Sequence, residues 1–437
     1  MKKKIINSLL LGTMLATSVI GLAACAPQTT HTHEYGSEAY YTVHDNKAFK
    51  CKQCFCGDEQ EIEILGALIA TPQNAQTILD GNINNRTIIF DGEFNDIISL
   101  RPTKATAKIY KANAAADATS IEQYTLGDEL TDELQNNHTY HYLRDVKNVK
   151  FAATNESKFN NLIYAESIAI SRNSISDKLT LNTVLYDAVK ELPLESTVSY
   201  FSHVNLENIE FDKMNFYGKN GRIVSYIYEP SETTPVYAKN ISITNCSFTT
   251  NESSKDTMVT STYVQAAINF TSCQTYNRVQ NITVKNCVIN GHNQGVALVN
   301  FNNVTLEGNT ISNTEHNAIA LQTADAADNN PKSASTGNVT IKNNIIFDIG
   351  KDIPTKERAI RFGVLKNANV VIENNNFTNC AEDRTAKGEG VQLLATQSIT
   401  TTTIDFKNNI YNNEVMQNTL HTDDVAVGSN FTIKISE

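Results

Sequence analysis

A short segment near the start of the chain collects the residue types that bind metal ions. Its candidates are His31, His33, His44, Cys51, Cys54 and Cys56. Cys51 and Cys54 have the Cys-x-x-Cys spacing, and Gly57 follows Cys56 in a tight knuckle whose backbone N–H groups can support thiolates. Thiolates and imidazoles are ligands that zinc prefers. The segment predicts one closed, structural zinc site with ligands among His33, His44, Cys51, Cys54 and Cys56.

A second set of reactive residues precedes four apolar segments in the second half of the chain. Arg and Lys can hold the carboxylates of acidic sugars, and Lys, Arg or His can remove a proton beside such a carboxylate. Two carboxylates can instead flank a glycosidic bond that is hydrolysed. The candidates for these roles are Lys356, Arg358, Arg361, His316, Glu315 and Glu389, accompanied by His292, Asn293, Asn317, Gln322 and Gln392.

The element that must position these residues is a nine-residue phrase that recurs along the chain. Its copies begin at Asn208, Asn240, Asn281, Asn303, Asn338, Asn369 and Thr403. Apolar and polar residues alternate in each copy, as in a β-strand, and an Asn-rich polar pair then interrupts the alternation. Asn tolerates left-handed backbone angles, so we expect a turn at that pair. One copy cannot bury its own apolar row, so the copies must stack.

The spacing of the copies predicts the architecture. Asn281 and Asn303 are 22 residues apart, about one turn of a wide parallel coil. A second short strand falls inside each interval, as at residues 318–322 and 359–363. Two repeating strands per turn, stacked in parallel, predict an all-β fold, a right-handed β-helix. The reactive residues before the second strands would then form an outward polar stripe, with equivalent positions about 4.8 Å apart.

Aligning the copies also defines an inward column. The column reads Met214, Cys246, Cys287, Asn309, Asn344, Asn375 and Asn409. Buried amides must be satisfied, so the four Asn predict a ladder in which each amide bonds its equivalent on the next coil. Apolar packing replaces the ladder at the Cys positions. An outward turn is the alternative for these Asn, and both interpretations are structural.

From about Asp145 to Tyr411, the chain resembles the right-handed parallel β-helix repeat family, the architecture of pectate-lyase-like proteins. The resemblance implies the fold, whereas function stays open because this coil hosts lyases, hydrolases, epimerases and adhesins. The polygalacturonase motif series is missing, and Gly291-His292-Asn293 only partly echoes one of its members. The Arg-x-Pro-x-x-Arg segment typical of pectate lyases is missing too.

The front of the chain predicts export. Three Lys precede an apolar run from Ile5 to Ala24, and Leu22-Ala23-Ala24-Cys25 resembles the lipobox of bacterial lipoproteins. That resemblance implies cleavage before Cys25 and acylation of Cys25, which would tether the protein to the cell envelope. A simple signal peptide or an uncleaved anchor is the alternative. Outside the cytosol, the cysteines of the metal-capable segment can also form a disulfide or stay free.

Composition limits the partners. The net charge is −11 and the isoelectric point about 5.4, which argues against nucleic-acid binding. The chain has no Trp, although 17 Tyr and 17 Phe could stack on sugars. No tight set of Asp residues indicates calcium, and no organic cofactor is expected. We expect a monomer.

These observations divide the chain into four parts. Residues 1–24 are the lipoprotein signal peptide, and residues 25–65 hold the lipidated Cys, a linker and the Cys/His module. Residues 66–144 form an N-terminal cap, with a helix at 72–82, and the first irregular coils. Residues 145–437 form the β-helix and end in a closing strand at 430–435. Segments 104–140 and 171–200 have no clear placement, and 118–133 is a short helix or a loop.

Two functions of different classes remain. The first, which we prefer, is a membrane-anchored surface module that binds polysaccharide or a host surface, supported by the solenoid and the anchor. The second is a polysaccharide lyase or glycoside hydrolase that acts on acidic glycans.

Overall fold

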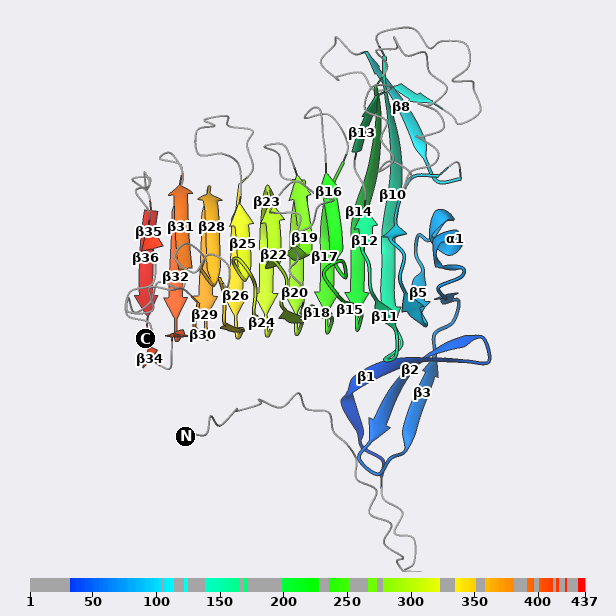
Figure 1. Cartoon of the computed structure of the whole chain (residues 1–437), viewed down its shortest axis with the longest axis horizontal. Coiled ribbons are helices and arrows are strands. Elements are labelled where there is room, and N and C mark those ends of the chain that lie inside the picture. Colours follow the sequence, from blue (N-terminus) through cyan, green and yellow to red (C-terminus); the bar gives the residue numbers. More distant parts are fainter. Residues whose placement is uncertain are drawn as a thin grey trace, which may run out of the picture.

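The computed structural model describes residues 32–103, 105–113, 122–124, 138–165, 168–171, 199–227, 236–251, 266–272, 278–322, 335–350, 358–380, 391–396, 401–411, 414–415, 421–422 and 431–436. In this part the protein is an elongated solenoid of stacked strands, with a small separate sheet and a short helix at its N-terminal end (Figure 1).

The strands of the solenoid form three long sheets, numbered here in the order in which the chain visits them. Sheet 1 contains β4 (Leu68–Ala70), β5 (Thr87–Phe90), β10 (His138–Ala153), β14 (Ser199–Asp212), β17 (Ala238–Thr244), β20 (Val279–Lys285), β23 (Phe301–Glu307), β26 (Gly337–Lys342), β29 (Ala368–Glu373), β32 (Thr402–Lys407) and β36 (Phe431–Ser436).

Sheet 2 contains β6 (Glu93–Phe94), β11 (Lys158–Phe159), β15 (Asn215–Tyr217), β18 (Ser247–Thr249), β21 (Val288–Asn290), β24 (Thr310–Ser312), β27 (Ile345–Phe347), β30 (Asn376–Thr378), β33 (Ile410–Tyr411) and β34 (Glu414–Val415). Sheet 3 contains β7 (Ile98–Ser99), β12 (Ile163–Ala165), β16 (Ile223–Ile227), β19 (Ala266–Ser272), β22 (Gln294–Val299), β25 (Ile319–Gln322), β28 (Ile360–Leu365), β31 (Val391–Thr396) and β35 (His421–Thr422).

The predicted all-β architecture of parallel, stacked strands is confirmed. The apolar column from the repeated phrase pairs rung by rung: Ile243 with Val284, Val284 with Leu306, Leu306 with Ile341 and Ile341 with Ile372. The prediction of two strands per turn is wrong, because the described coils use three. Each phrase contributes both a sheet 1 strand and a short sheet 2 strand, separated by the corner at its polar pair.

Left-handed backbone angles make that corner possible. Asn245, Asn286, Asn343, Asn374 and Asn408 have φ between +52° and +57° at equivalent positions. An Asn side chain bonds locally and tolerates this region better than most residues, which explains why the corner selects Asn.

The next residue in each corner points into the solenoid and forms an inner Asn ladder. The Nδ2 atom of Asn309 donates to Oδ1 of Asn344 at 3.0 Å, Asn344 to Asn375 at 2.9 Å, and Asn375 to Asn409 at 2.9 Å. Each Oδ1 also accepts the backbone N–H of the preceding Asn in the ladder. All four side chains are buried, so the ladder satisfies the polar groups of the corner without water.

Two cysteines continue this column toward the N-terminal end. The Cys287 side chain has no amide with which to extend the ladder, but its backbone N–H donates to Oδ1 of Asn309 at 2.9 Å. The Sγ atoms of Cys246 and Cys287 lie 3.7 and 3.5 Å from strand carbonyl oxygens of the preceding coil. Burial raises the pKa of the Cys246 thiol, so it stays protonated and packs as a small apolar group.

Phenylalanine stacks fill the core of the first coils. Phe94 and Phe159 lie 5.0 Å apart, and Phe216 and Phe248 lie 4.7 Å apart between ring centroids, with their planes almost parallel. In the next three coils the same inward position of sheet 2 holds Ile289, Ile311 and Ile346 instead.

A three-stranded antiparallel sheet, made of β1 (Tyr35–His44), β2 (Lys47–Cys54) and β3 (Glu59–Glu63), packs against the start of sheet 1 (Figure 1). The buried Tyr41 donates its hydroxyl to Asp212 Oδ2 at 2.7 Å, and Lys150 Nζ lies 3.1 Å from the same carboxylate. Burial alone would raise the pKa of Asp212, but the hydrogen bonds of Tyr41 and Asn245 and the charge of Lys150 outweigh it and lower the pKa.

Helix α1 (Ala75–Asp80) falls within the predicted 72–82 segment and buries Ala75 and Leu79 in the solenoid core. Its function as a cap stays a prediction. Beside it, β10 and β14 extend past the coil and pair with β8 (Lys108–Asn113) and β13 (Ile168–Ser171), forming a projecting arm (Figure 1). β9 (Glu122–Tyr124) pairs with β8, and the rest of 118–133 and most of 171–200 lie outside the described residues.

The inner ladder predicts a large cost for removing one rung. In Asn344→Ala, Asn309 loses the acceptor for its backbone N–H and side chain, and the Leu306 carbonyl loses its donor. We expect the free energy of unfolding in urea to fall by about 2–4 kcal/mol. Thr340→Ala, on the half-exposed outer side of the same coil, is the control and should cost less than about 1 kcal/mol. An equal fall in the free energy of unfolding in both variants would contradict the conclusion that the ladder stabilises the fold.

Candidate functional site

The polar stripe predicted along sheet 3 is mostly buried. His292, Asn293, Glu315, Asn317 and Arg358 lie at the corner between sheets 2 and 3 and are at most 6% exposed. At this corner the Glu315 N–H donates to the His292 carbonyl at 3.1 Å, and the buried Asn317 side chain accepts the Arg358 N–H through Oδ1 at 2.9 Å. The prediction of a solvent-facing stripe is therefore wrong at these residues.

Arg361, His316 and Gln322 are partly exposed. Arg361 stands beside Ala320 and Gln392 in an outward column of sheet 3. Ala297 and Ala320 in this column are themselves buried, so the stripe is interrupted. Lys356 and Glu389 lie outside the described residues, as does the side chain of Gln392.

His292 is the most perturbed titratable group at this corner. Burial, and then the positive charge of Arg222, lower the pKa of His292 to about 3. Neither ring nitrogen has a hydrogen-bond partner, although the side chain is fully buried. The imidazole is consequently neutral at any working pH.

The structure brings three of the predicted metal ligands together. The ligand atoms of His33, Cys54 and Cys56 lie within 4.8 Å of one another, and Cys56 Sγ is 3.4 Å from His33 Nδ1. The backbone hydrogen bond from Cys56 is the largest of the interactions that lower the pKa of Cys54 to about 6. A thiolate is thus accessible near neutral pH, as metal binding requires.

The other two predicted ligands lie elsewhere on the same sheet. Cys51 is buried, with Sγ 3.2 Å from Thr42 Oγ1 and 3.9 Å from Glu61 Oε1, and burial raises its pKa. His44 lies at the opposite end of β2 from Cys54, where its ring stacks on Phe49 at 4.1 Å and its Nε2 approaches Glu61 at 3.3 Å. The Cys-x-x-Cys spacing therefore does not identify the group that converges.

A charged cluster that the sequence analysis missed lies on the outer face of sheet 1. Glu207 accepts from Lys239 at 3.0 Å, from Lys147 at 3.1 Å and from the Tyr237 hydroxyl at 3.1 Å. The ammonium of Lys239 lies 4.5 Å from the centroid of the Tyr237 ring. Hydrogen bonds from Lys239 and Lys147 lower the pKa of Glu207 to about 2. Aligning the residue before each phrase would have shown the series Lys147, Glu207, Lys239.

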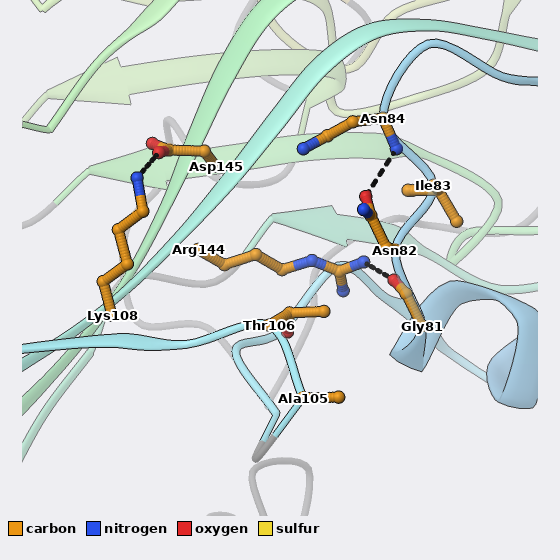
Figure 2. Close-up of a pocket in the computed structure, with 9 residues that line it drawn as sticks. All are labelled: Gly81, Asn82, Ile83, Asn84, Ala105, Thr106, Lys108, Arg144 and Asp145. Carbon is orange, nitrogen blue, oxygen red and sulfur yellow. Dashed lines mark hydrogen bonds and ion pairs between the residues drawn. The ribbon is translucent and has the colours of Figure 1, made fainter. Parts of the chain in front are cut away.

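A pocket of about 180 Å³ lies at the base of the arm, where β10 leaves the coil (Figure 2). Its central side chain is Arg144, 1% exposed, which donates to the carbonyls of Arg101 at 2.9 Å and Gly81 at 2.8 Å. Burial lowers the pKa of Arg144 to about 10, so it stays charged. At the pocket wall, Lys108 donates to Asp145 at 2.7 Å. Because Arg144 donates to these two backbone carbonyls, its role in the pocket is structural: it holds β10 against the end of α1.

A second depression of about 180 Å³ opens on the outer face of sheet 1, farther along the solenoid. Hydroxyl and amide side chains from three successive coils line it: Thr283, Thr305 and Thr340, with Asn281, Asn303 and Asn338. The Asn belong to an exposed outer ladder in which Asn281 donates to Asn240 at 2.8 Å and Asn303 to Asn281 at 3.1 Å. We call this depression the sheet 1 groove.

Residues 146–415 match the family described as "Right handed beta helix region". The chain belongs to this family. Membership gives the hand of the coil and, because a fold does not fix an activity, assigns no function by itself. No helix among the described residues combines the length and hydropathy needed to cross a bilayer.

One solved structure found by the comparison is a mannuronic acid specific polysaccharide family 6 lyase from human gut microbiota. It is 9% identical, covers 85% of this chain and 82% of its own, and superposes with a TM-score of 0.27. A score this low carries no argument about function. The comparison with curated proteins found no match.

The buried His292 predicts an acid-dependent loss of stability. The unfolded state takes up a proton below about pH 6.5, whereas the folded state resists protonation until about pH 3. Stability from this site is thus complete above pH 6.5, and it falls by up to about 1.4 kcal/mol per pH unit below it. In His292→Leu, urea unfolding between pH 7.5 and 5 should show a shallower dependence on pH by this amount. The same slope in both proteins would contradict a buried, neutral imidazole.

Proposed function

We propose that the protein is an envelope-anchored module that binds a long polysaccharide along the outer face of sheet 1. The observation that carries the proposal is the sheet 1 groove, where equivalent hydroxyl and amide groups recur on successive coils. Such groups hydrogen-bond sugar hydroxyls, and their axial repetition suits a polymer that contacts one coil after another.

The charged cluster around Tyr237 supports the same face. Tyr237 immediately precedes β17. The next two strands of sheet 1, β20 and β23, carry Asn281 and Asn303, so the cluster and the groove lie along the same face of sheet 1. A half-exposed aromatic ring flanked by Lys147 and Lys239 offers apolar contact to a sugar ring and cations to any carboxylate on it.

The carboxylates support binding rather than hydrolysis. A general acid needs a raised pKa. Among the described residues, the Asp and Glu whose pKa values depart from the ordinary range are all shifted downward: Asp145, Glu207, Asp212 and Glu307. The lyase or hydrolase alternative would instead rest on Arg361 and His316, with Lys356 and Glu389.

We also propose that Cys25 is acylated and tethers the module to the bilayer. The eight residue-to-residue steps from Cys25 to His33 span at most roughly 28 Å when fully extended, so the three-stranded sheet would sit close to the membrane surface. Two or three acyl chains bind durably, since each buried methylene adds about 0.8 kcal/mol.

Removing the three groove hydroxyls should weaken glycan binding. The triple variant Thr283→Val, Thr305→Val and Thr340→Val keeps side-chain shape and loses up to three hydrogen bonds, each about 0.5–1.5 kcal/mol. Affinity electrophoresis against neutral and uronate polymers should show about 10- to 100-fold weaker binding to the polymer that the wild type prefers.

The matched control places the same substitution on sheet 2, as Thr249→Val, Thr310→Val and Thr378→Val, and should bind like the wild type. An equal loss in the control would contradict binding on sheet 1. Release of unsaturated uronates or new reducing ends from any polymer in the panel would replace the binding proposal with an enzymatic one.

Acylation has a separate test. Cells that express Cys25→Ser should release the protein from the membrane fraction and fail to label it with an alkyne analogue of palmitate. Cys246→Ala, in the solenoid core, keeps Cys25 and should remain labelled and membrane-bound. Membrane retention and labelling of Cys25→Ser would contradict the lipid anchor.

A further inference from the structure

We infer that His33, Cys54 and Cys56 together bind one zinc ion, and that Cys51 and His44 take no part in it. Among the described residues, these three form the group of His, Cys and carboxylate ligand atoms that converges. The inference concerns the three-stranded sheet and is independent of glycan binding on the solenoid.

The distances are close to those of a metal site. Zinc bonds to sulfur and nitrogen measure about 2.3 and 2.0 Å, so ligand atoms around a tetrahedral ion lie about 3.5 Å apart. Cys56 Sγ and His33 Nδ1 are already 3.4 Å apart, and no pair in the group exceeds 4.8 Å. Small rotations of His33 and Cys56, whose side chains face solvent, would bring these three ligand atoms to such distances.

The backbone holds both thiols on one side of a tight turn. The N–H of Gly57 donates to the Cys54 carbonyl at 2.9 Å, and the N–H of Cys54 donates to the Asp58 carbonyl at 2.7 Å. Gly57 has φ of +90°, a conformation that residues with a Cβ rarely adopt. The turn therefore presents Cys54 and Cys56 together without help from the metal.

The third ligand arrives from a different strand. Tyr35 pairs with Cys54, and this register brings His33, two residues earlier, beside the turn. Asp58 Oδ2 lies 3.4 Å from His33 Nδ1 and accepts the Tyr35 hydroxyl at 2.7 Å. This carboxylate faces the same His33 nitrogen that would bind zinc, so Asp58 places negative charge beside the cation rather than orienting the imidazole through its other ring nitrogen.

Zinc at this position would join the segment that enters β1 to the turn that leaves β2. A three-stranded sheet has a small core, and this one buries only a few apolar side chains against the solenoid, such as Tyr41 and Ala48. A metal crosslink at its free end supplies stability that so small a core lacks.

The test is metal analysis of the full-length protein, purified with zinc present and then freed of unbound ion. The wild type should contain about one zinc per chain, and His33→Ala, Cys54→Ser and Cys56→Ser should each lose most of it. The matched controls Cys51→Ser and His44→Ala remove a Cys and a His from the same sheet and should keep it.

Cobalt substitution checks the ligands where a variant folds poorly. The thiolate-to-cobalt charge-transfer band should be strong in the wild type, weak or absent in Cys56→Ser and unchanged in Cys51→Ser. A wild type without bound metal, a disulfide that includes Cys54 or Cys56 in the zinc-treated protein, or loss of zinc in Cys51→Ser as complete as in Cys54→Ser would overturn the inference.

Discussion

The fold depends on the vertical stacking of equivalent residues. Each inward residue rests on its counterpart one coil away, so a buried polar group has only that counterpart and the adjacent backbone as partners. Asn meets this constraint because one amide offers both donors and acceptors. The chain Asn309–Asn344–Asn375–Asn409 uses them toward both neighbours. The ladder also sets the register, because a slip of one residue would replace every rung and expose the apolar column.

The same stacking governs the outer surface. In sheet 1, an outward column reads Lys285, Glu307, Lys342, Glu373 and Lys407, so the charge changes sign at every coil. Glu307 accepts from Lys285 at 3.2 Å and from Lys342 at 3.4 Å. Like charges stacked directly on one another would repel. The alternation of Lys and Glu avoids this repulsion and keeps charged, hydrated side chains beside the groove. Beside this column, the uncharged Thr and outer Asn repeat unchanged through the groove, and this repetition is what the proposal of a repeating ligand rests on.

Sequence alone could predict the strands, their parallel stacking and the turn at the Asn pairs, because strand alternation and left-handed Asn are local properties. It could not predict the third strand, since the two or three residues of each sheet 2 strand are too few to show a period. It misjudged His292 and Arg358 because alternation separates inside from outside only along a strand. At a corner this alternation no longer applies, and a side chain such as that of Asn317 is instead buried where it accepts a backbone N–H. In the Cys/His segment, spacing named five candidates, and only the β1–β2 register separates His33 from His44.

The proposal that a polymer lies along sheet 1 has a direct thermodynamic test. Calorimetric titration with oligosaccharides of increasing length, cut from the polymer that binds best, measures how many coils take part. The account predicts that affinity rises with each added sugar until the ligand spans the coils from Tyr237 to Thr340, and then becomes constant. The same affinity for the shortest and longest oligosaccharides, or no measurable binding of any polymer, would contradict it.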